Sequence, residues 1–267
     1  MEYIYSNYPV IFGNVFYGSI ICFIIFELLA PHRAYFQGSK VRWINNILLG
    51  GLNMLLVRFL LPISAVGIAA YAESETIGLF NKVSLPLCVE FIISFILIDL
   101  MGYFLHRASH TYSILWRFHL VHHSDVNVDV STSVRHHPVE PLISMIFTSI
   151  IIMSLGAPLI SVIFYEIFRI IISTFSHANI KIPNYIDRIL SLVIVTPNFH
   201  CIHHAANKHD TNSNYSNALS CWDYLFSTYN SSGQEHFSIG LEYFRSNRDK
   251  FIDRLITQPI RYKNNRN

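Results

Sequence analysis

The apolar stretch SLPLCVEFIISFILIDLMGYFL, residues 84–105, runs directly into the histidine pair His106-Arg-Ala-Ser-His110. It is long enough to cross a bilayer, because about 20 apolar residues span the hydrocarbon core. Glu90 and Asp99 are its only charged residues. The sequence therefore predicts a membrane-spanning helix that ends in two histidines.

Three further apolar stretches surround this one. Residues 10–30 and 45–72 are each long enough for a span, the second interrupted only by Arg58. A cleaved signal peptide is disfavoured at 10–30, because no basic segment precedes it and no small-residue cleavage site follows. Residues 142–176 are broken by Gly156-Ala157-Pro158, which favours a helical hairpin. We expect an all-α membrane protein with about four transmembrane helices, including a short hairpin.

The composition agrees with a membrane location. The 267 residues are 52% apolar and 13% charged, with a mean hydropathy of +0.36, whereas soluble domains carry about 25% charged residues. A net charge of +2 provides no basic patch for nucleic acid, and no G-x-G-x-x-G motif is present. We therefore expect a membrane partner and no nucleic-acid partner.

Loop charges predict the orientation. The 31–44 loop carries Arg33, Lys40 and Arg42, whereas the 73–83 loop is mainly acidic. The positive-inside rule then makes the first loop cytoplasmic. Counting spans from there places every histidine cluster at the cytoplasmic rim, in a cytosolic helical cap. Residues 230–267 are expected to form a basic, cytosolic amphipathic tail, in which Phe251, Ile252, Leu255 and Ile256 indicate an interfacial helix.

Histidines dominate the chemistry: eleven of the fourteen lie between His106 and His204. They form three clusters, namely His106/His110, His119/His122/His123 and His200/His203/His204. On a helix, positions i, i+3 and i+4 share one face, so each cluster can present several imidazoles together. A lone histidine is usually structural, but a repeated H-x-x-H-H is hard to obtain from packing. Eight imidazoles exceed the needs of one tetrahedral ion and suit two adjacent metal ions.

Other chemistries are disfavoured. H-E-x-x-H and G-x-S-x-G are absent, which argues against a zincin protease and a serine hydrolase. A transporter would hold its ligands near the bilayer midplane. Iron held by nitrogen ligands and reacting with O2 fits best. His32, His209 and His236 are expected at the surface, and His136-His137-Pro138 is expected on a loop.

From Asp99 to Tyr229 the sequence resembles the fatty acid hydroxylase / sterol desaturase superfamily of membrane-bound di-iron enzymes. The resemblance rests on HRASH, WRFHLVHH, RHHPVEP, FSHANI, TPNFHCIHH and NYSNALSCWDYLFSTY. It implies as metal ligands His106, His110, His119, His122, His123, His200, His203 and His204, with His177 as a further ligand and His137 as an open case. It also implies an N-terminal transmembrane region at 1–98 and a catalytic region at 99–229. Ser216 and Ser227 stand where glycine is usual in the family.

The same resemblance implies an O2-dependent oxidoreductase that hydroxylates or desaturates a lipid C–H bond, the lipid being a sterol, a fatty acyl chain or a related molecule. The implied cofactors are two iron ions, which zinc could replace in purified protein. Electrons are expected from a separate donor of the cytochrome b5 or ferredoxin type. A bacterial inner membrane is expected rather than the endoplasmic reticulum. The alternatives are a non-redox membrane metal-binding or transport protein and a catalytically silent scaffold.

Polar residues near the clusters are candidates for orienting the imidazole rings: Asp99, Asp125, Asp129, Glu140, Asn179, Asn198, Asp210 and Asp223. Trp222-Asp223 is expected to tie the last loop beneath the metal site. Arg58, Glu90 and Asp99 could line a substrate path or pair with one another. An apolar cavity between the spans is expected to admit an acyl chain or sterol.

Overall fold

The computed structural model describes residues 2–34, 39–61, 63–231 and 238–263. These residues form helices and loops, and their only β structure is a few isolated β-bridges. The prediction of an all-α protein is confirmed. His236, predicted at the surface, lies outside the described residues, as do parts of the 230–267 tail.

Four segments are long and apolar enough to cross a membrane: Tyr3–Leu29, Lys40–Ser74, Leu87–Thr111 and Leu159–His177. They correspond to α1 (Glu2–Leu29), α2 (Ser39–Leu60) with α3 (Ala65–Ser74), α4 (Leu87–Thr111) and α7 (Leu159–His177). The predicted 45–72 span is thus two helices, and the Ser64 side chain caps the second by accepting from Gly67 N at 3.1 Å. The expected number of spans is confirmed.

The predicted hairpin is present as α6 (Val139–Leu155) and α7. Gly156 ends α6 in the left-handed region, with φ of 65°, and Pro158 precedes α7. The backbone of Gly78 packs directly on Gly156, where a side chain on either residue would clash. Hydrogen bonds from Leu79 N and Phe80 N to the last carbonyls of α6 fix this turn. The break in hydrophobicity at 156–158 is therefore a tight turn at one end of the bundle.

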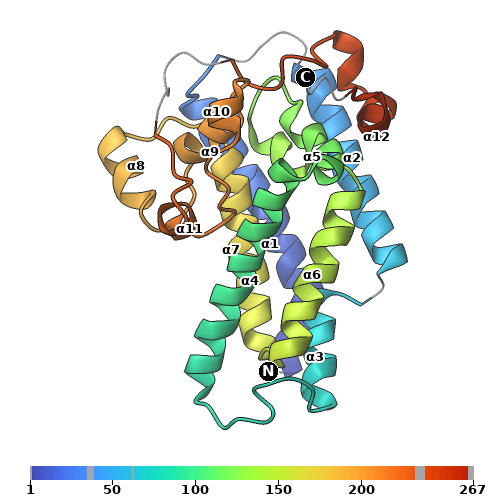
Figure 1. Ribbon diagram of the computed structural model, residues 1–267, viewed down its shortest axis with the longest axis vertical. Helices are drawn as coiled ribbons and strands as arrows, with labels where there is room; N and C mark the ends of the chain where they lie inside the picture. The colour runs from blue at the N-terminus through green and yellow to red at the C-terminus, as the bar shows by residue number, and fades with distance from the viewer. Residues whose placement is uncertain (1, 35–38, 62, 232–237, 264–267) are drawn as a thin grey trace.

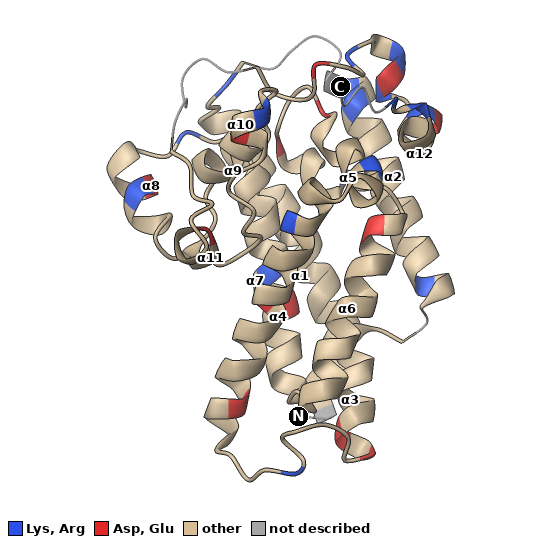
Figure 2. Ribbon diagram, in the orientation of Figure 1, with Lys and Arg blue, Asp and Glu red and all other residues tan. Residues whose placement is uncertain are grey.

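The helix directions bring all the histidine-bearing ends together. In Figure 1, α1, α4 and α7 run upward, whereas α2 with α3 and α6 run downward. Helix α4 contacts both α6 and α7, and α1 packs against α7. The lower bundle has an apolar core that includes Val66, Ile98, Ile152 and Val162. Figure 2 shows Lys and Arg mainly around the upper end.

Short elements cover the upper end. They are α5 (Ser113–His123), η1 (Val130–Val134), α8 (Asn184–Leu190), α9 (Pro197–His203), α10 (Lys208–Thr211), α11 (Cys221–Leu225), η2 (Asn247–Lys250) and α12 (Ile252–Arg261). The expected interfacial helix is α12, but Leu255 is fully buried against Leu49 and Leu120. Part of its apolar face therefore packs on α2 and α5, while Ile256 and Ile260 remain exposed.

Candidate metal centre

Nine buried histidines converge at the upper end of the bundle. They come from the last turns of α4, from α5, from the last residue of α7 and from α9 with the residue after it. One group contains His106, His110, His119, His123 and His203, and a second contains His122, His177, His200 and His204. Within each group, the ligand nitrogens all lie within 4.8 Å of one another.

Each H-x-x-H-H motif is shared between the two groups. In α5, His119 and His123 belong to the first group and His122 to the second; around α9, His203 belongs to the first and His200 and His204 to the second. This division follows from helix geometry, because residues i and i+4 lie about 40° apart on one side and i+3 lies about 60° away on the other. The motif therefore presents imidazoles to two neighbouring groups at once.

The two groups are adjacent in space. The rings of His123 and His204, one from each group, are stacked with centroids 4.6 Å apart. His122 and His204, which share the second group, have the same centroid separation. This proximity fits two neighbouring metal ions better than two independent sites.

In four of the rings, hydrogen bonds determine which nitrogen carries the proton. The Nδ1 atoms of His106, His203, His177 and His122 lie 2.7, 2.7, 2.7 and 3.1 Å from the carbonyl oxygens of Tyr215, Ser213, Ser173 and Arg135. A carbonyl oxygen only accepts, so each Nδ1 must donate. The proton on Nδ1 leaves a lone pair on Nε2, which is the form that binds a metal.

These lone pairs point at one another. Nε2 of His122 lies 3.2 Å from Nε2 of His177, and since both carry lone pairs they cannot form a hydrogen bond. Two ligands of one ion, each about 2.0–2.1 Å from it, lie roughly 3.0–3.4 Å apart. His203 Nε2 and both nitrogens of His110 are buried with no hydrogen-bond partner in the described part of the chain. The residues therefore fit a pair of metal ions.

Burial also keeps the rings in the ligating form. It lowers the pKa of His203 to about 3 and lowers the pKa values of His122, His123, His200 and His204 well below the ordinary value. Neighbouring imidazoles act in the same direction, because two protonated rings would repel each other. These five histidines are neutral near pH 7, as metal ligation requires.

Among the predicted orienting residues, Glu140 has a side chain that contacts a ring of the two groups. Its Oε2 accepts from His119 Nδ1 at 2.6 Å, and its Oε1 accepts from the backbone N–H of His137 at 3.1 Å. The Nδ1 atoms of His106, His122, His177 and His203 donate to backbone carbonyls instead. A sequence pattern does not reveal such partners. Most of the predicted orienting side chains therefore act on the loops and not on the rings.

The loop after α10 is tied down as predicted for Trp222-Asp223. Asp223 accepts from the backbone N–H groups of Tyr215 and Ser216, each at 2.8 Å, and so fixes the carbonyl that holds His106. Trp222 Nε1 donates to Asp99 at 2.7 Å. Asp99 is thus a structural acceptor and pairs with neither Arg58 nor Glu90. Ser227 has φ of 55°, which explains a usual glycine there.

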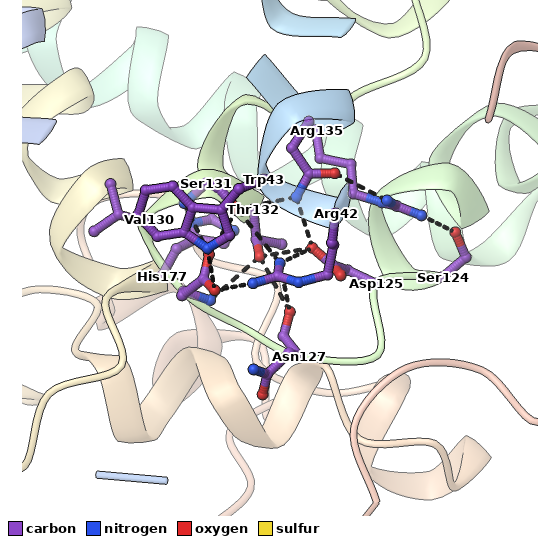
Figure 3. A network of polar contacts seen from close by, with 12 residues as sticks. Arg42, Trp43, Ser124, Asp125, Asn127, Val130, Ser131, Thr132, Arg135 and His177 are labelled. Atoms are coloured by element: carbon purple, nitrogen blue, oxygen red, sulfur yellow. Dashed lines mark hydrogen bonds and ion pairs between the residues drawn. The ribbon is translucent and has the colours of Figure 1, made fainter. Parts of the chain in front are cut away.

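A buried ionic network supports the loop between α5 and η1 (Figure 3). Arg42 of α2 donates to Asp125 at 2.7 Å and also to Asp129. Arg135 donates to Val121 O at 2.8 Å and Ser124 Oγ at 2.7 Å. Burial raises the pKa of Asp125, but Arg42 and Arg135 outweigh it, so the pKa lies below its ordinary value. In the sequence, Arg42 is recognisable only as a positive charge in the first loop, because its carboxylate partners are distant along the chain.

The remaining histidines lie outside the two groups. His137 Nε2 donates to Ile256 O at 3.3 Å, and its ring contacts Phe118, so the structure does not bring it to the ligand set. His136 stacks on His122 with centroids 4.4 Å apart. His32 and His209 are exposed, which confirms the prediction that they are surface residues.

A cavity of about 390 Å³ adjoins the histidines and extends downward between α4, α6 and α7. Five of the nine histidines line it: His106, His119, His122, His177 and His200. Its wall includes apolar residues such as Ile98 and Leu105, but also the charged residues Glu166 and Arg169. The expected cavity is present, and it is not purely apolar.

Comparison with known proteins gives the family. Residues 91–228 match the sequence profile described as Fatty acid hydroxylase, which covers half of the chain. The chain belongs to the fatty acid hydroxylase family. The matched region contains all nine converging histidines.

Three similar proteins are named for the compounds on which they act. The chain is 27% identical to the ornithine lipid hydroxylase of Rhizobium tropici, over 84% of this chain and 69% of that protein. It is 27% identical to human alkylglycerol monooxygenase and 28% identical to a very-long-chain aldehyde decarbonylase of rice (Oryza sativa subsp. indica), over 53% and 54% of this chain. It spans only 31% and 24% of those two proteins. No solved structure matches the chain.

The Arg42 network predicts a large effect of one distant substitution. Arg42→Met removes the arginine that forms ion pairs with two buried carboxylates, which should cost about 3–5 kcal/mol of unfolding free energy. Thermal unfolding of the purified protein in detergent measures the loss. Arg248→Met removes an arginine from an exposed pair with Asp253 and serves as the control, with an expected midpoint close to the unsubstituted protein. Equal midpoints for the two variants would contradict the assigned role of Arg42.

Proposed function

We propose that this protein is a membrane-bound oxidoreductase that uses O2 to hydroxylate or desaturate a C–H bond of a lipid. The observation that carries the proposal is the pair of interlocked, all-nitrogen histidine groups that open onto a cavity between membrane helices. The lipid hydroxylase and monooxygenase among its relatives support the same reaction class. A metal transporter is disfavoured, because its ligands would lie near the bilayer midplane, and these lie at one end of the bundle.

The proposed cofactors are two iron ions, one in each histidine group, with zinc as a substitute in purified protein. Imidazole nitrogens are suitable ligands for iron and zinc alike. Bound iron would supply the redox chemistry that activates O2 for attack on an unactivated C–H bond. His137 is left out of the proposed ligand set, because its ring hydrogen-bonds elsewhere.

The chain's own residues have three tasks in this proposal. The nine Nε2 or Nδ1 atoms bind the ions, and the carbonyls of Tyr215, Arg135, Ser173 and Ser213 hold four rings in the ligating tautomer. The carboxylate of Glu140 holds His119 and places one negative charge beside otherwise neutral ligands. Burial of all nine rings shields them from bulk water, except where five of them line the cavity.

We further propose that residues 99–229 form the catalytic region and that the histidine end faces the cytoplasm of a bacterial cell, with the protein in the inner membrane. Arg33 and Arg42 lie at the histidine end, where Arg33 N donates to Asn179 and Arg42 binds Asp125. The acidic residues Glu73 and Glu75 lie at the other end. A separate electron donor of the cytochrome b5 or ferredoxin type would then reach the site from the cytoplasmic side.

Single ligand substitutions test the metal assignment. His203→Ala and His122→Ala each remove a ligand from a different group, so each should lower the metal content from about two ions per chain toward one and abolish turnover. Elemental analysis of the purified protein measures the metal. His137→Ala is the matched control and should keep the full content. Full metal content in both ligand variants would refute the assignment.

Oxygen-dependent turnover tests the reaction class. Metal-free protein is loaded anaerobically with ferrous iron, supplied with a chemical reductant and a bacterial lipid extract, and then exposed to O2. Mass spectrometry should show lipids that have gained one oxygen atom or lost two hydrogen atoms, with no change under nitrogen. If the protein holds its metal and every lipid stays unchanged, the non-redox metal-binding alternative is favoured instead.

Tag accessibility tests the orientation. A tag inserted at Thr76, in the acidic loop, should be labelled in intact spheroplasts, and a tag at the C-terminal end should be labelled only after permeabilisation. The physical reason is the retention of Lys- and Arg-rich loops on the cytoplasmic side. The opposite labelling pattern would place the histidines on the outer face.

A further inference from the structure

Two helices present polar side chains to the cavity at the spacing of one helix face. On α6 these are Glu140, Ser144 and Thr148, four residues apart; on α7 they are Glu166, Arg169, Ser173 and His177, three or four residues apart. Side chains at these intervals lie above one another on one side of a helix. Both helices therefore direct a row of polar side chains toward the cavity. Such a row is notable because only 13% of the residues in the chain are charged.

Glu166 and Arg169 form a charged pair in the membrane-spanning part of the cavity wall. Arg169 precedes His177 by eight residues, which is roughly 12 Å along an α-helix, and it lies near the middle of the 19-residue α7. Ionisable side chains at this depth are costly, and they usually mark a pathway or a binding site. This position therefore calls for an explanation from ligand binding or from packing.

Hydrogen bonds within the protein use little of the pair, although Arg169 also interacts electrostatically with Asp99 on α4 and Tyr8 on α1. Arg169 Nη2 donates to Glu166 Oε2 at 3.1 Å, and this is the one hydrogen bond that either side chain makes within the described residues. Both residues belong to α7, so the bond joins no two helices. Well-packed apolar residues would often serve stability equally well or better than a buried ion pair. By contrast, the neighbouring Tyr165 bonds to Asp99 on α4 and has a clear structural partner.

Both side chains keep unused hydrogen-bonding capacity. A guanidinium has five N–H donors, and only one is used here. The side chains of Arg169 and Glu166 are 40% and 16% exposed, and both line the cavity. Asn217 also lines it, and its amide lies beside Gly102, where a Cβ atom would come within 3.0 Å of Nδ2. The wall thus offers several donors and at least one free carboxylate oxygen.

We propose that Glu166 and Arg169 form a recognition site for the zwitterionic headgroup of the lipid substrate. The pair has no net charge, so a ligand that carries both an ammonium and an anionic group leaves no uncompensated charge in the membrane. The planar guanidinium of Arg169 can bind a carboxylate or a phosphate through two N–H groups, and the carboxylate of Glu166 can bind the ammonium. The inference rests on the proposed function, because it assigns the substrate class of the same cavity.

A lipid-retention assay tests this inference without turnover. The full-length purified protein is exchanged into detergent with equal amounts of an amino-acid lipid, phosphatidylethanolamine, phosphatidylglycerol and diacylglycerol. After washing, the bound lipids are quantified by mass spectrometry. The unsubstituted protein should retain the two zwitterionic lipids at least fivefold over phosphatidylglycerol and diacylglycerol. A preference for the amino-acid lipid identifies a carboxylate, and a preference for phosphatidylethanolamine identifies a phosphate.

Two conservative variants should change lipid retention in different ways. Glu166→Gln leaves an unpaired cation, so the preference should shift at least fivefold toward anionic phosphatidylglycerol. Arg169→Gln leaves an unpaired anion, so anionic and zwitterionic lipids should both be retained less. The neutral double variant should lose discrimination, and it tests the inference if a single variant does not fold. Glu73→Gln, in α3 at the opposite end from the histidines, is the control and should match the unsubstituted protein.

The outcomes separate this inference from the proposed function. Unchanged lipid ratios in all cavity variants, or no zwitterionic preference in the unsubstituted protein, would overturn the headgroup site even if O2-dependent turnover is found. The predicted shifts together with failed turnover would overturn the oxygenase proposal and leave the headgroup site in place.

Discussion

The concentration of imidazole lone pairs in a buried interior is the constraint on which the rest of the structure depends. Nε2 atoms that cannot hydrogen-bond to one another lie about as far apart as two ligands of one ion. A cation between them turns this arrangement from costly to favourable, since unpaired buried polar atoms are destabilising. The helix bundle, the loop network and the carbonyl acceptors all serve to hold these rings in that arrangement.

Helix geometry and loop anchoring divide this task. The i, i+3 and i+4 spacing in α5 and around α9 distributes each motif over two centres, so neither centre can form without both motifs. The loops then orient the rings, because their backbone carbonyls accept hydrogen bonds from the Nδ1 atoms. Asp223 and the Arg42–Asp125 network hold these loops in place. An arginine on α2, far from the histidines in sequence, is thereby linked to the orientation of His122 through the loop that ends at Arg135.

The membrane bundle contributes a cavity whose chemistry differs from its surroundings. Most of α6 and α7 is apolar, yet each helix directs polar side chains toward the space below the histidines. Such groups are costly at membrane depth, and their alignment along one wall is the basis of the proposed headgroup site. The cavity and the histidine centre therefore form one continuous functional region.

The sequence by itself determined the all-α class, the spans, the turn at 156–158 and eight of the nine converging histidines, with His177 added by resemblance to the family. Long apolar stretches and repeated histidine spacing are local properties, and they survive any tertiary arrangement. Only the tertiary structure decided how the motifs divide between two groups, that His137 lies apart, and that Asp99 holds a loop. It also decided the carbonyl partners of the rings and the joint polar face of the cavity. These depend on contacts between segments distant in sequence, for which one chain carries no periodic signal.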